Sequence, residues 1–436
     1  MNAFSEIGGL SQQGAELRKR RLSLLALFLV SVFNYVDRTI LSILQIPIKA
    51  ELVLSDGQMG ALTGLAFALF YSACSLPIAR ITDATSRKTV ILFSLAFWSL
   101  MTAMTGVATS FVMLIIFRIG VAVGEAGSVP ASVSLLSDNY PPVQRATAMS
   151  TWGLALPVGL TLGYSATGWL ADAFGWRVAF AIVGGTGVLL VPLVFALLSE
   201  PPRGRYDAPG EAAKEIPPVL VSLSWLWRIK AFRYTVLGIT LHGFSQYAMM
   251  SWNAPFFART HHLSLSEVAL LMAVLSGVGG AIGMYLGGFV ADRLAVRDPR
   301  WRVWVIALVV GATIPVALVQ YLAGSTVLSI VAAAFAAALM VAYYGPLLAV
   351  TQSVVPPQMR AFSNAVMGLV FNLVGLGLGP WITGMCSDML GRYFGLGEQS
   401  LRYALVLSLV PACAGAAVFL YAARFWAAPK QSDKTA

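Results

Sequence analysis

Charged residues are scarce in this sequence. Asp, Glu, Lys and Arg together make up 11% of its 436 residues, roughly half their share in an ordinary soluble domain. Hydrophobic residues make up 58%, and apolar blocks of about 20 residues recur almost from end to end. A soluble chain of this length would divide into two or three domains joined by polar linkers. The composition instead predicts an all-α integral membrane protein that crosses the bilayer many times.

Several chemical signatures are also missing. The three cysteines lie apart in apolar blocks without CxxC spacing, which supports neither a disulfide framework nor a metal site. No GxxxxGK[ST], HExxH or GxSxG motif occurs, which disfavours ATP-driven transport and the common intramembrane hydrolases. We therefore expect no enzyme activity, no catalytic residue, no metal and no cofactor. The alternative is a membrane enzyme or receptor, and detection of lipid turnover by the purified protein would favour it.

The net charge of +10 does not indicate a nucleic-acid partner, because the basic residues lie between apolar blocks and do not cluster with aromatics on a soluble face. The basic cluster at 18–21 leads into an apolar stretch that is too long for a signal peptide and has no cleavage site. We expect the first span to stay in the mature protein.

Twelve apolar segments are long enough to cross a bilayer. They cover residues 22–46, 58–79, 89–108, 111–136, 146–171, 178–198, 234–257, 266–291, 303–322, 326–350, 361–385 and 403–424. The longest polar stretch separates six spans from six. The predicted organisation is a cytoplasmic segment 1–21, a six-helix bundle 22–198, a cytoplasmic linker 199–233, a second bundle 234–424 and a cytoplasmic tail 425–436.

The loop charges predict the orientation. Of the 29 lysines and arginines, 22 lie on the side of the N-terminus, the even-numbered loops and the C-terminus, and 5 lie on the other side. Both termini are therefore predicted to be cytoplasmic. The compact, basic chain suggests a bacterial inner-membrane protein.

The two halves repeat each other. YPPVQRATAMSTWGL at 140–154 matches VPPQMRAFSNAVMGL at 355–369, and VGLTLGYSATGWLADAFG at 158–175 matches VGLGLGPWITGMCSDMLG at 374–391. Span 5 thus recurs as span 11, about half a chain later. This pattern predicts two parallel repeats related by an axis along the membrane normal, as in six-plus-six transporters.

The organisation and the loop motifs resemble the major facilitator superfamily. ARITDATSRK at 79–88 resembles that superfamily's signature between spans 2 and 3, with Ala79 and Ala84 as departures, and GFVADRLAVR at 288–297 is its second-half counterpart. The resemblance implies a fold of two pseudo-symmetric six-helix bundles in which spans 1 and 4 line a central cavity. It also implies a monomer.

Within the superfamily, four motifs together resemble the Spinster family: NYVDR at 34–38, RIGVAVGEA at 118–126, LPVGLTLGY at 156–164 and EPPRG at 200–204. The first and the pattern of the second also occur in organic-anion symporters, so those two are ambiguous. The Spinster resemblance implies a secondary carrier, of lysolipids or sphingoid phosphates in animal relatives.

Four charges lie deep in spans, where a charge costs several kcal/mol and usually marks an ion or substrate pathway. They are Asp37, Arg38, Arg118 and Glu125. Arg118 and Glu125 are two helical turns apart, about 10 Å along the axis, so they need partners from another helix. We expect Asp37 or Glu125 to pair with Arg118, favour Asp37, and expect Arg38 to meet water, backbone carbonyls or a substrate anion. A buried structural ion-pair network is the alternative.

This set can couple protons to transport. A carboxyl group in a desolvated cavity tends to hold a proton, while a nearby guanidinium favours its release. Asp37 and Glu125 are the candidate proton carriers, and Arg38 and Arg118 can bind a phosphate or carboxylate through two oxygens at once. Weaker candidates for lining the cavity, with interhelical packing as the alternative, are His242, Gln246, Tyr343 and Asn372.

Loop charges of the superfamily motifs resemble an inner gate whose ion pairs form when the cytoplasmic ends of the spans close. The first-half candidates are Asp83, Arg87, Arg145, Glu200 and Arg203, with Asp292, Arg293 and Arg360 as second-half partners. Single exposed pairs contribute under about 1 kcal/mol, so only a network would bias the equilibrium.

These observations predict a proton-coupled secondary active transporter that works by alternating access, with the proton gradient as its coupling ion. A cavity that combines charges with apolar walls favours a small amphipathic or lipid-like anion, of the lysolipid or sphingoid phosphate class. The alternatives are a proton symporter for sugar acids or other carboxylates, and an uncoupled facilitator.

Overall fold

We describe the protein from a computed structural model in which residues 2–206, 219–298, 300–355 and 359–426 are placed well enough to describe. These ranges consist of helices and short connections and contain no strand, which confirms the predicted all-α class. Most of the predicted tail at 425–436 and the middle of the predicted linker at 199–233 lie outside the described residues.

The chain forms two compact units. The first comprises Met1–Leu44 and Phe70–Ala212, and the second comprises Gln45–Leu69 and Ala213–Ala436. The units differ from the predicted bundles in one respect. Residues 45–69, which form the end of span 1 and the start of span 2, group with the second half of the chain. The reason is a set of close contacts that these residues make there, described below.

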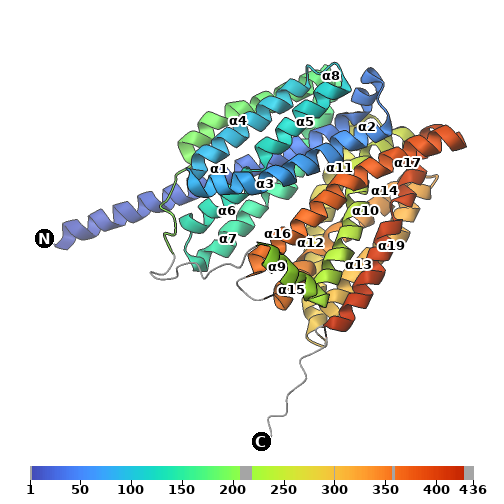
Figure 1. The fold of residues 1–436 in the computed structure, drawn as a ribbon. Helices are drawn as coiled ribbons and strands as arrows, with labels where there is room; N and C mark the ends of the chain where they lie inside the picture. The colour runs from blue at the N-terminus through green and yellow to red at the C-terminus, as the bar shows by residue number, and fades with distance from the viewer. Residues whose placement is uncertain (1, 207–218, 299, 356–358, 427–436) are drawn as a thin grey trace, which may run out of the picture. The chain divides into compact units, whose positions relative to one another are not determined.

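The helices of the first unit run side by side in one bundle (Figure 1). In chain order they are α1 (Asn2–Leu52), which continues into the second unit, α3 (Ala66–Ala84), α4 (Arg87–Thr105), α5 (Phe111–Glu125), α6 (Ser128–Asn139), α7 (Pro142–Gly153) and α8 (Ala155–Leu197).

The second unit begins with the end of α1, α2 (Asp56–Gly60) and a π-helical turn η1 (Ala61–Leu65). Its other elements are α9 (Val219–Arg228), α10 (Lys230–His261), α11 (Leu265–Val274), η2 (Leu275–Gly279), α12 (Gly280–Ala295), α13 (Trp301–Leu322), α14 (Thr326–Ala342), α15 (Tyr344–Val354), α16 (Arg360–Val370), η4 (Phe371–Leu378), α17 (Gly379–Phe394), η5 (Gly397–Gln399), α18 (Ser400–Leu407), α19 (Val410–Ala422) and η6 (Ala423–Phe425).

The predicted spans are all helical. Ten helical stretches of the described chain are long and apolar enough to cross a membrane, and one of these, Pro142–Leu197, covers two predicted spans. The division between the two falls at Gly175, whose φ of 79° lies in the left-handed region that glycine adopts without strain. The remaining predicted span is α10, whose polar residues lower its hydropathy. Together these elements account for the twelve predicted spans.

The internal repeat extends to irregularities within the spans. Span 2 contains the π-helical turn that begins at Ala61, and span 8 contains one of equal length that begins at Leu275, 214 residues later. Span 4 is interrupted after Glu125, where α5 ends, and span 10 is interrupted at Tyr343, where α14 ends. Such interruptions inside helices are frequent at functional sites.

The core of the second unit is built mainly from aliphatic and aromatic side chains of α10, α13 and α19. It includes Phe232, Val236, Ile239, Val303, Ile306, Val310 and Phe419. Around it, small residues let helices approach closely, as is common in membrane bundles. A Cβ atom on Gly283 would fall on the carbonyl oxygen of Ala338, and one on Gly287 would fall on that of Ala342, so α12 and α14 are in backbone contact at both points.

This contact predicts a position-specific effect of size. Gly287→Val places a branched side chain against the backbone of α14 and should lower the thermal midpoint of the purified protein, because overpacking costs about 1–3 kcal/mol. Gly288→Val is the matched control, since a Cβ there meets nothing within 4 Å. Equal midpoints for the two variants would show that α12 and α14 do not pack in this way.

Candidate functional site

The four deep charges lie together within the first unit. Arg38 of α1 donates from Nε to Oε2 of Glu125 on α5 at 2.8 Å, forming an ion pair. Asp37, the neighbour of Arg38, accepts a 2.6 Å hydrogen bond at Oδ1 from the Thr102 hydroxyl of α4. Arg118 is also buried and lies within electrostatic reach of the other three charges. Two helices, α1 and α5, thus bring two acids and two bases to one place, and α4 adds the Thr102 hydroxyl.

Both carboxyl groups are deeply buried. Glu125 is fully buried and Asp37 is 3% exposed, whereas the side chain of Arg38 is 27% exposed. Within the described chain, the second carboxyl oxygen of each acid, Oδ2 of Asp37 and Oε1 of Glu125, has no hydrogen-bond partner. Buried polar atoms are normally paired, and each exception calls for an explanation such as a proton, a water or a ligand.

Arg38 also has an aromatic neighbour. Its guanidinium carbon lies 5.2 Å from the centre of the Tyr71 ring, within the distance at which a cation is attracted to a ring face. The ion pair and this contact together fix the position of the Arg38 guanidinium.

One pairing differs from the expectation from the sequence. Glu125 pairs with Arg38, which was expected to meet water, backbone carbonyls or substrate. Asp37 accepts a hydrogen bond from Thr102 and lies within electrostatic reach of Arg118, and its favoured pairing with Arg118 stays a prediction. The spacing of charges along each helix does not determine how α1 is rotated against α5, and this rotation decides which side chains meet.

Glycines of α8 set the position of α1. A Cβ on Gly159 would fall 2.7 Å from the carbonyl oxygen of Val32, and one on Gly163 would fall 2.8 Å from the Cα of Val36 and onto the Thr39 hydroxyl. Only glycine allows α8 to pack this closely on the turns of α1 that flank Asp37. These glycines belong to the LPVGLTLGY motif, so the helix that carries this motif packs directly on the part of α1 that carries the NYVDR motif.

A break in span 4 sets the position of Glu125, the last residue of α5. Residues 126–127 form a turn and α6 starts at Ser128. Pro130 has no backbone N–H, so it cannot donate to the carbonyl of Ala126, and the helix is interrupted there. The acid is therefore held where two helix ends meet inside the span.

The second unit contains a cluster of uncharged polar side chains. Tyr343 donates a 2.7 Å hydrogen bond to Oε1 of Gln246, whose Nε2 donates to the carbonyl oxygen of Met340 at 3.0 Å. The His242 ring lies edge-on to the Tyr343 ring, with centres 4.8 Å apart. The structure thus brings three of the four weaker candidates together at the break in span 10. The fourth, Asn372, instead accepts a 3.4 Å hydrogen bond from Tyr247.

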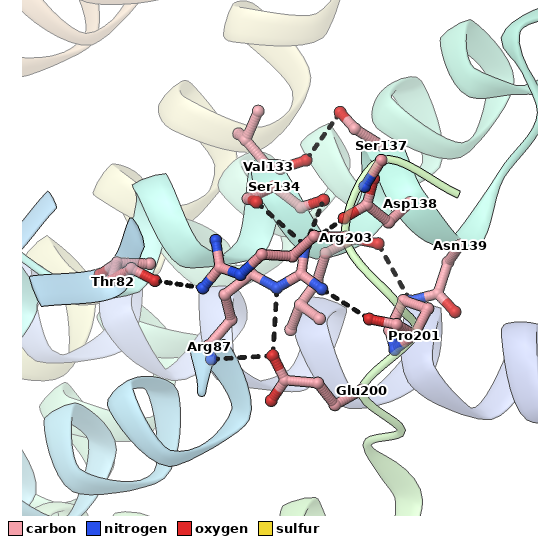
Figure 2. Close-up of polar contacts among 12 residues, drawn as sticks. Thr82, Arg87, Val133, Ser134, Ser137, Asp138, Asn139, Glu200, Pro201 and Arg203 are labelled. Atoms are coloured by element: carbon pink, nitrogen blue, oxygen red, sulfur yellow. Dashed lines mark hydrogen bonds and ion pairs between the residues drawn. The ribbon is translucent and has the colours of Figure 1, made fainter. Parts of the chain in front are cut away.

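The predicted gate residues Arg87 and Glu200 form a network inside the first unit, drawn in Figure 2. The buried Arg87 forms ion pairs with Asp138 of α6 and with Glu200, to which its Nε donates at 3.1 Å. It also donates from Nη1 to Ser134 at 3.2 Å and from Nη2 to the carbonyl oxygen of Pro201 at 2.7 Å. One guanidinium therefore ties α4, α6 and the segment after α8 together.

Glu200 also caps the N-terminus of α4. Its carboxylate accepts backbone hydrogen bonds from Arg87 and Lys88, both 3.0 Å, and one from the Ser86 hydroxyl. Unpaired N–H groups and the helix dipole make such an end favourable for an anion. Although partial burial alone would raise it, these hydrogen bonds hold the pKa of Glu200 below its ordinary value.

The other predicted gate residues do not join this network as one set. Arg203 donates to the carbonyl oxygens of Thr82 and Thr85 at 2.7 and 2.6 Å, and Arg145 donates to that of Ser137 at 2.8 Å. Asp83, Asp292, Arg293 and Arg360 are exposed. Pairing across the two halves stays a prediction.

Sequence reasoning missed a third buried acid, Asp56, at the start of α2. It is 3% exposed. It accepts hydrogen bonds from Arg259 at 2.8 and 2.7 Å, from Lys49 at 2.5 Å and from the Ser387 hydroxyl at 2.8 Å. The Asp388 carboxylate accepts hydrogen bonds from the backbone N–H groups of Asp56 and Gly57, at 2.9 and 2.7 Å, at the N-terminus of the same short helix.

The Asp56 cluster is reinforced by backbone contacts. A Cβ on Gly60 would fall on the carbonyl oxygen of Pro380, and one on Gly384 would fall on that of Asp56. The Gln45 amide donates to the carbonyl oxygen of Ser251 at 2.7 Å. Residues 45–69 are therefore locked onto α10 and α17. Asp56, Lys49 and Arg259 all lie near predicted span ends, where charges are common, so the sequence offered little to distinguish them. The capping box of Ser55 and Gln58 was a usable sign of a helix start.

The fold and the buried charges agree with a family match along the chain. The pattern of the Major Facilitator Superfamily matches residues 27–380 and, in a second match, 235–435. The chain belongs to the Major Facilitator Superfamily. It is a multi-pass membrane transporter rather than an enzyme, as the sequence predicted.

Within the superfamily, the chain is similar to solved structures and to named relatives. A bacterial homologue of the human lysosomal transporter Spinster, in an inward-facing and unoccupied conformation, is 31% identical with a TM-score of 0.85 over 94% of this chain and 98% of that chain. An MFS-type efflux pump of Mycolicibacterium smegmatis is 34% identical over 87% of both chains. The hexuronate transporter of Bacillus subtilis is 27% identical over 85% of this chain and 89% of its own. The predicted resemblance to Spinster is confirmed.

The Glu200 cap predicts a pH-dependent stability. Because the folded state lowers the pKa of Glu200, its contribution is complete above the ordinary pKa of about 4.5 and is lost as pH falls through the lower folded value. Near neutral pH, Glu200→Gln should lower the thermal midpoint of the purified protein, since hydrogen bonds to a charged group contribute about 1.5–3 kcal/mol. The difference from wild type should shrink as pH falls below about 4.5. Asp172→Asn, at an exposed acid, is the control, and a constant difference at all pH values would contradict this assignment.

The Asp56 cluster predicts a change in accessibility. In a variant whose three native cysteines are replaced by serine, Ser251→Cys places a thiol where the side chain is 8% exposed and meets Thr63. Adding Asp56→Asn removes the carboxylate shared by Lys49 and Arg259, which are only partly buried, and so weakens the contacts that hold residues 45–69 on α10 and α17. The rate of alkylation by a membrane-impermeant maleimide should then rise on the order of tenfold or more. Glu398→Gln, at an exposed acid, should leave the rate unchanged. An unchanged rate in Asp56→Asn would show that the Asp56 cluster does not hold residues 45–69 on α10 and α17.

Proposed function

We propose that this protein is a proton-coupled secondary active transporter that works by alternating access. The observation that carries the proposal is the buried Arg38–Glu125 ion pair, with Asp37 and Arg118 beside it. Charges at this depth are costly to keep in a bilayer without a use, and they usually belong to ion or substrate pathways. The unpaired carboxyl oxygens of both acids leave room for a proton or a ligand.

The coupling step follows from the arrangement of the four charges. A guanidinium beside a buried carboxylate favours the charged form, and loss of that guanidinium favours the protonated acid. A substrate anion that draws Arg38 or Arg118 toward itself therefore promotes proton uptake by Glu125 or Asp37. Departure of the substrate restores the pair and releases the proton. The same four side chains serve symport or antiport.

The substrate that we propose is a small amphipathic anion of the lysolipid or sphingoid phosphate class. The two arginines provide planar forks suited to a phosphate or carboxylate. In the second unit, His242, Gln246, Tyr343 and Asn372 are the neutral polar candidates for substrate binding. The similarity to a bacterial homologue of Spinster supports this class only through the Spinster resemblance, which implies lysolipids or sphingoid phosphates in animal relatives.

A sugar acid or similar carboxylate is the second candidate. The observation that favours it is the similarity to the Bacillus subtilis hexuronate transporter over most of both chains. Arg38 and Arg118 would then bind a compact carboxylate. An uncoupled facilitator uses the same residues for binding alone, and the two possibilities differ in their response to a pH gradient.

Alternating access requires contacts that break in turn. The Asp56 cluster holds residues 45–69 on α10 and α17. We propose that these hydrogen bonds break at one step of the transport cycle, so that residues 45–69 move away from α10 and α17. The Arg87 network ties the elements of the first unit together. The proposed cytoplasmic gate charges are Asp83, Arg145 and Arg203 in the first unit and Asp292, Arg293 and Arg360 in the second. The excess of basic residues supports a bacterial inner-membrane location with both termini cytoplasmic, and we propose a monomer as the working unit.

Transport by proteoliposomes under a pH gradient tests the proposal. Glu125→Gln and Asp37→Asn should each reduce proton-driven uptake, on the order of tenfold or more for the acid that carries the proton. Arg118→Ala should weaken substrate binding. Asp172→Asn, which removes an exposed acid of the same unit, should behave as wild type.

Competition by a lysophospholipid and by a hexuronate identifies the substrate class in the same assay. Inhibition by the lysophospholipid supports the amphipathic anion, and inhibition by the hexuronate alone supports the second candidate. Folded variants that all move substrate without any dependence on the pH gradient would overturn proton coupling and leave a facilitator.

A further inference from the structure

Helix α9 is too short to cross the membrane and leaves most of its apolar surface uncovered. Its ten residues span about 15 Å, half the thickness of the bilayer core. Leu226 is fully buried in the core of the second unit and Ser222, one turn earlier, is 4% exposed. Val221, Trp225 and Trp227 are 55%, 39% and 45% exposed. The helix thus contacts the unit along a single stripe and presents two tryptophans outward, at one end of the bundle (Figure 1).

A basic and aromatic cluster follows α9 directly. At the start of α10, Tyr234 packs on Tyr421 and Phe425 at the end of the last span, with ring centres 5.0 and 5.4 Å apart. Three bases lie over these rings. Lys230 is 5.7 Å from the centre of Phe425, Arg233 is 5.1 Å from that of Tyr234 and Arg424 is 5.4 Å from that of Tyr421. Arg228, the last residue of α9, is exposed beside them.

These bases have no acidic counterpart in the described part of the chain. The sequence contains no Asp or Glu between Glu215 and Glu267, nor between Glu398 and Asp433. No carboxylate of the described residues lies within ion-pair distance of Arg228, Lys230, Arg233 or Arg424. The cation–π contacts hold three of the charges in place without neutralising them.

The chemistry of this surface matches one occupant. Tryptophan is enriched where a bilayer meets water, and basic side chains at that depth pair with lipid phosphates. We propose that α9, the first turn of α10 and the end of the last span form a binding surface for the headgroups of anionic phospholipids. The acyl chains lie against Trp225, Trp227 and Val221, and the phosphates meet the four bases. This surface uses none of the four deep charges of the first unit.

Lipid-dependent stabilisation of the purified full-length protein tests the proposal. Short-chain phosphatidylglycerol should raise the thermal midpoint in a saturable way, and short-chain phosphatidylcholine should not. Each base near an anionic lipid strengthens binding roughly fivefold, so Arg228→Gln/Lys230→Gln/Arg424→Gln should raise the half-saturating phosphatidylglycerol concentration on the order of a hundredfold. Arg228→Lys/Arg424→Lys retains the charges and should stay close to wild type.

Two control variants distinguish binding at this surface from binding elsewhere on the protein. Arg18→Gln/Lys19→Gln/Arg21→Gln removes three exposed bases of the N-terminal segment and should leave the titration unchanged, because it lowers the net charge without touching the surface. Arg118→Ala should also leave the titration unchanged, because it alters the transport site alone.

Three results would overturn the proposal. They are equal stabilisation by phosphatidylcholine, an unaltered titration of the triple variant, and displacement of phosphatidylglycerol by inorganic phosphate at similar concentration, which would indicate a general anion site. If the triple variant does not fold, the single variant Lys230→Gln should shift the half-saturating concentration roughly fivefold. The absence of any shift would count against the proposal in the same way.

Discussion

The buried ion pair between Arg38 and Glu125 is the constraint on which the first unit depends. Neither charge could remain at this depth alone, because an unpaired buried charge costs several kcal/mol. The pair requires α1 and α5 to keep one rotation and one depth relative to each other. The glycines of α8 let it pack closely on α1 and so fix the position of α1. The break after Glu125 places this acid at the end of α5. Sequence features that look independent therefore serve one contact.

The two halves place polar groups at corresponding irregularities but use different chemistry. Glu125 lies at the break in span 4, and Tyr343 lies at the break in span 10. The first unit supplies charge, while the cluster of His242, Gln246 and Tyr343 supplies neutral hydrogen bonds and ring surface. The repeated helix pattern therefore carries charged side chains in one unit and uncharged polar side chains in the other.

Much of this organisation could be predicted because a bilayer imposes strong rules on composition. The twelve spans, the repeat and the depth of Asp37 and Glu125 follow from which residues hydrocarbon tolerates. The pairing of the charges could not be predicted, because it depends on how α8 packs on α1. The Asp56 cluster escaped prediction for another reason. Its charges sit at span ends, where the sequence alone does not separate a solvated carboxylate from one that accepts hydrogen bonds from Arg259, Lys49 and Ser387.

The central proposal is that the Arg38–Glu125 pair couples substrate binding to a change in the number of bound protons. Proton exchange upon substrate binding, followed with a pH indicator in weakly buffered detergent solution, tests it most directly. We predict that the transported anion changes the number of bound protons in the wild type, and that Glu125→Gln still binds the anion but exchanges none. If Asp37 is the carrier, Asp37→Asn shows this loss instead. Binding without proton exchange in the wild type, or equal exchange in both acid variants and the wild type, would contradict proton coupling by these residues.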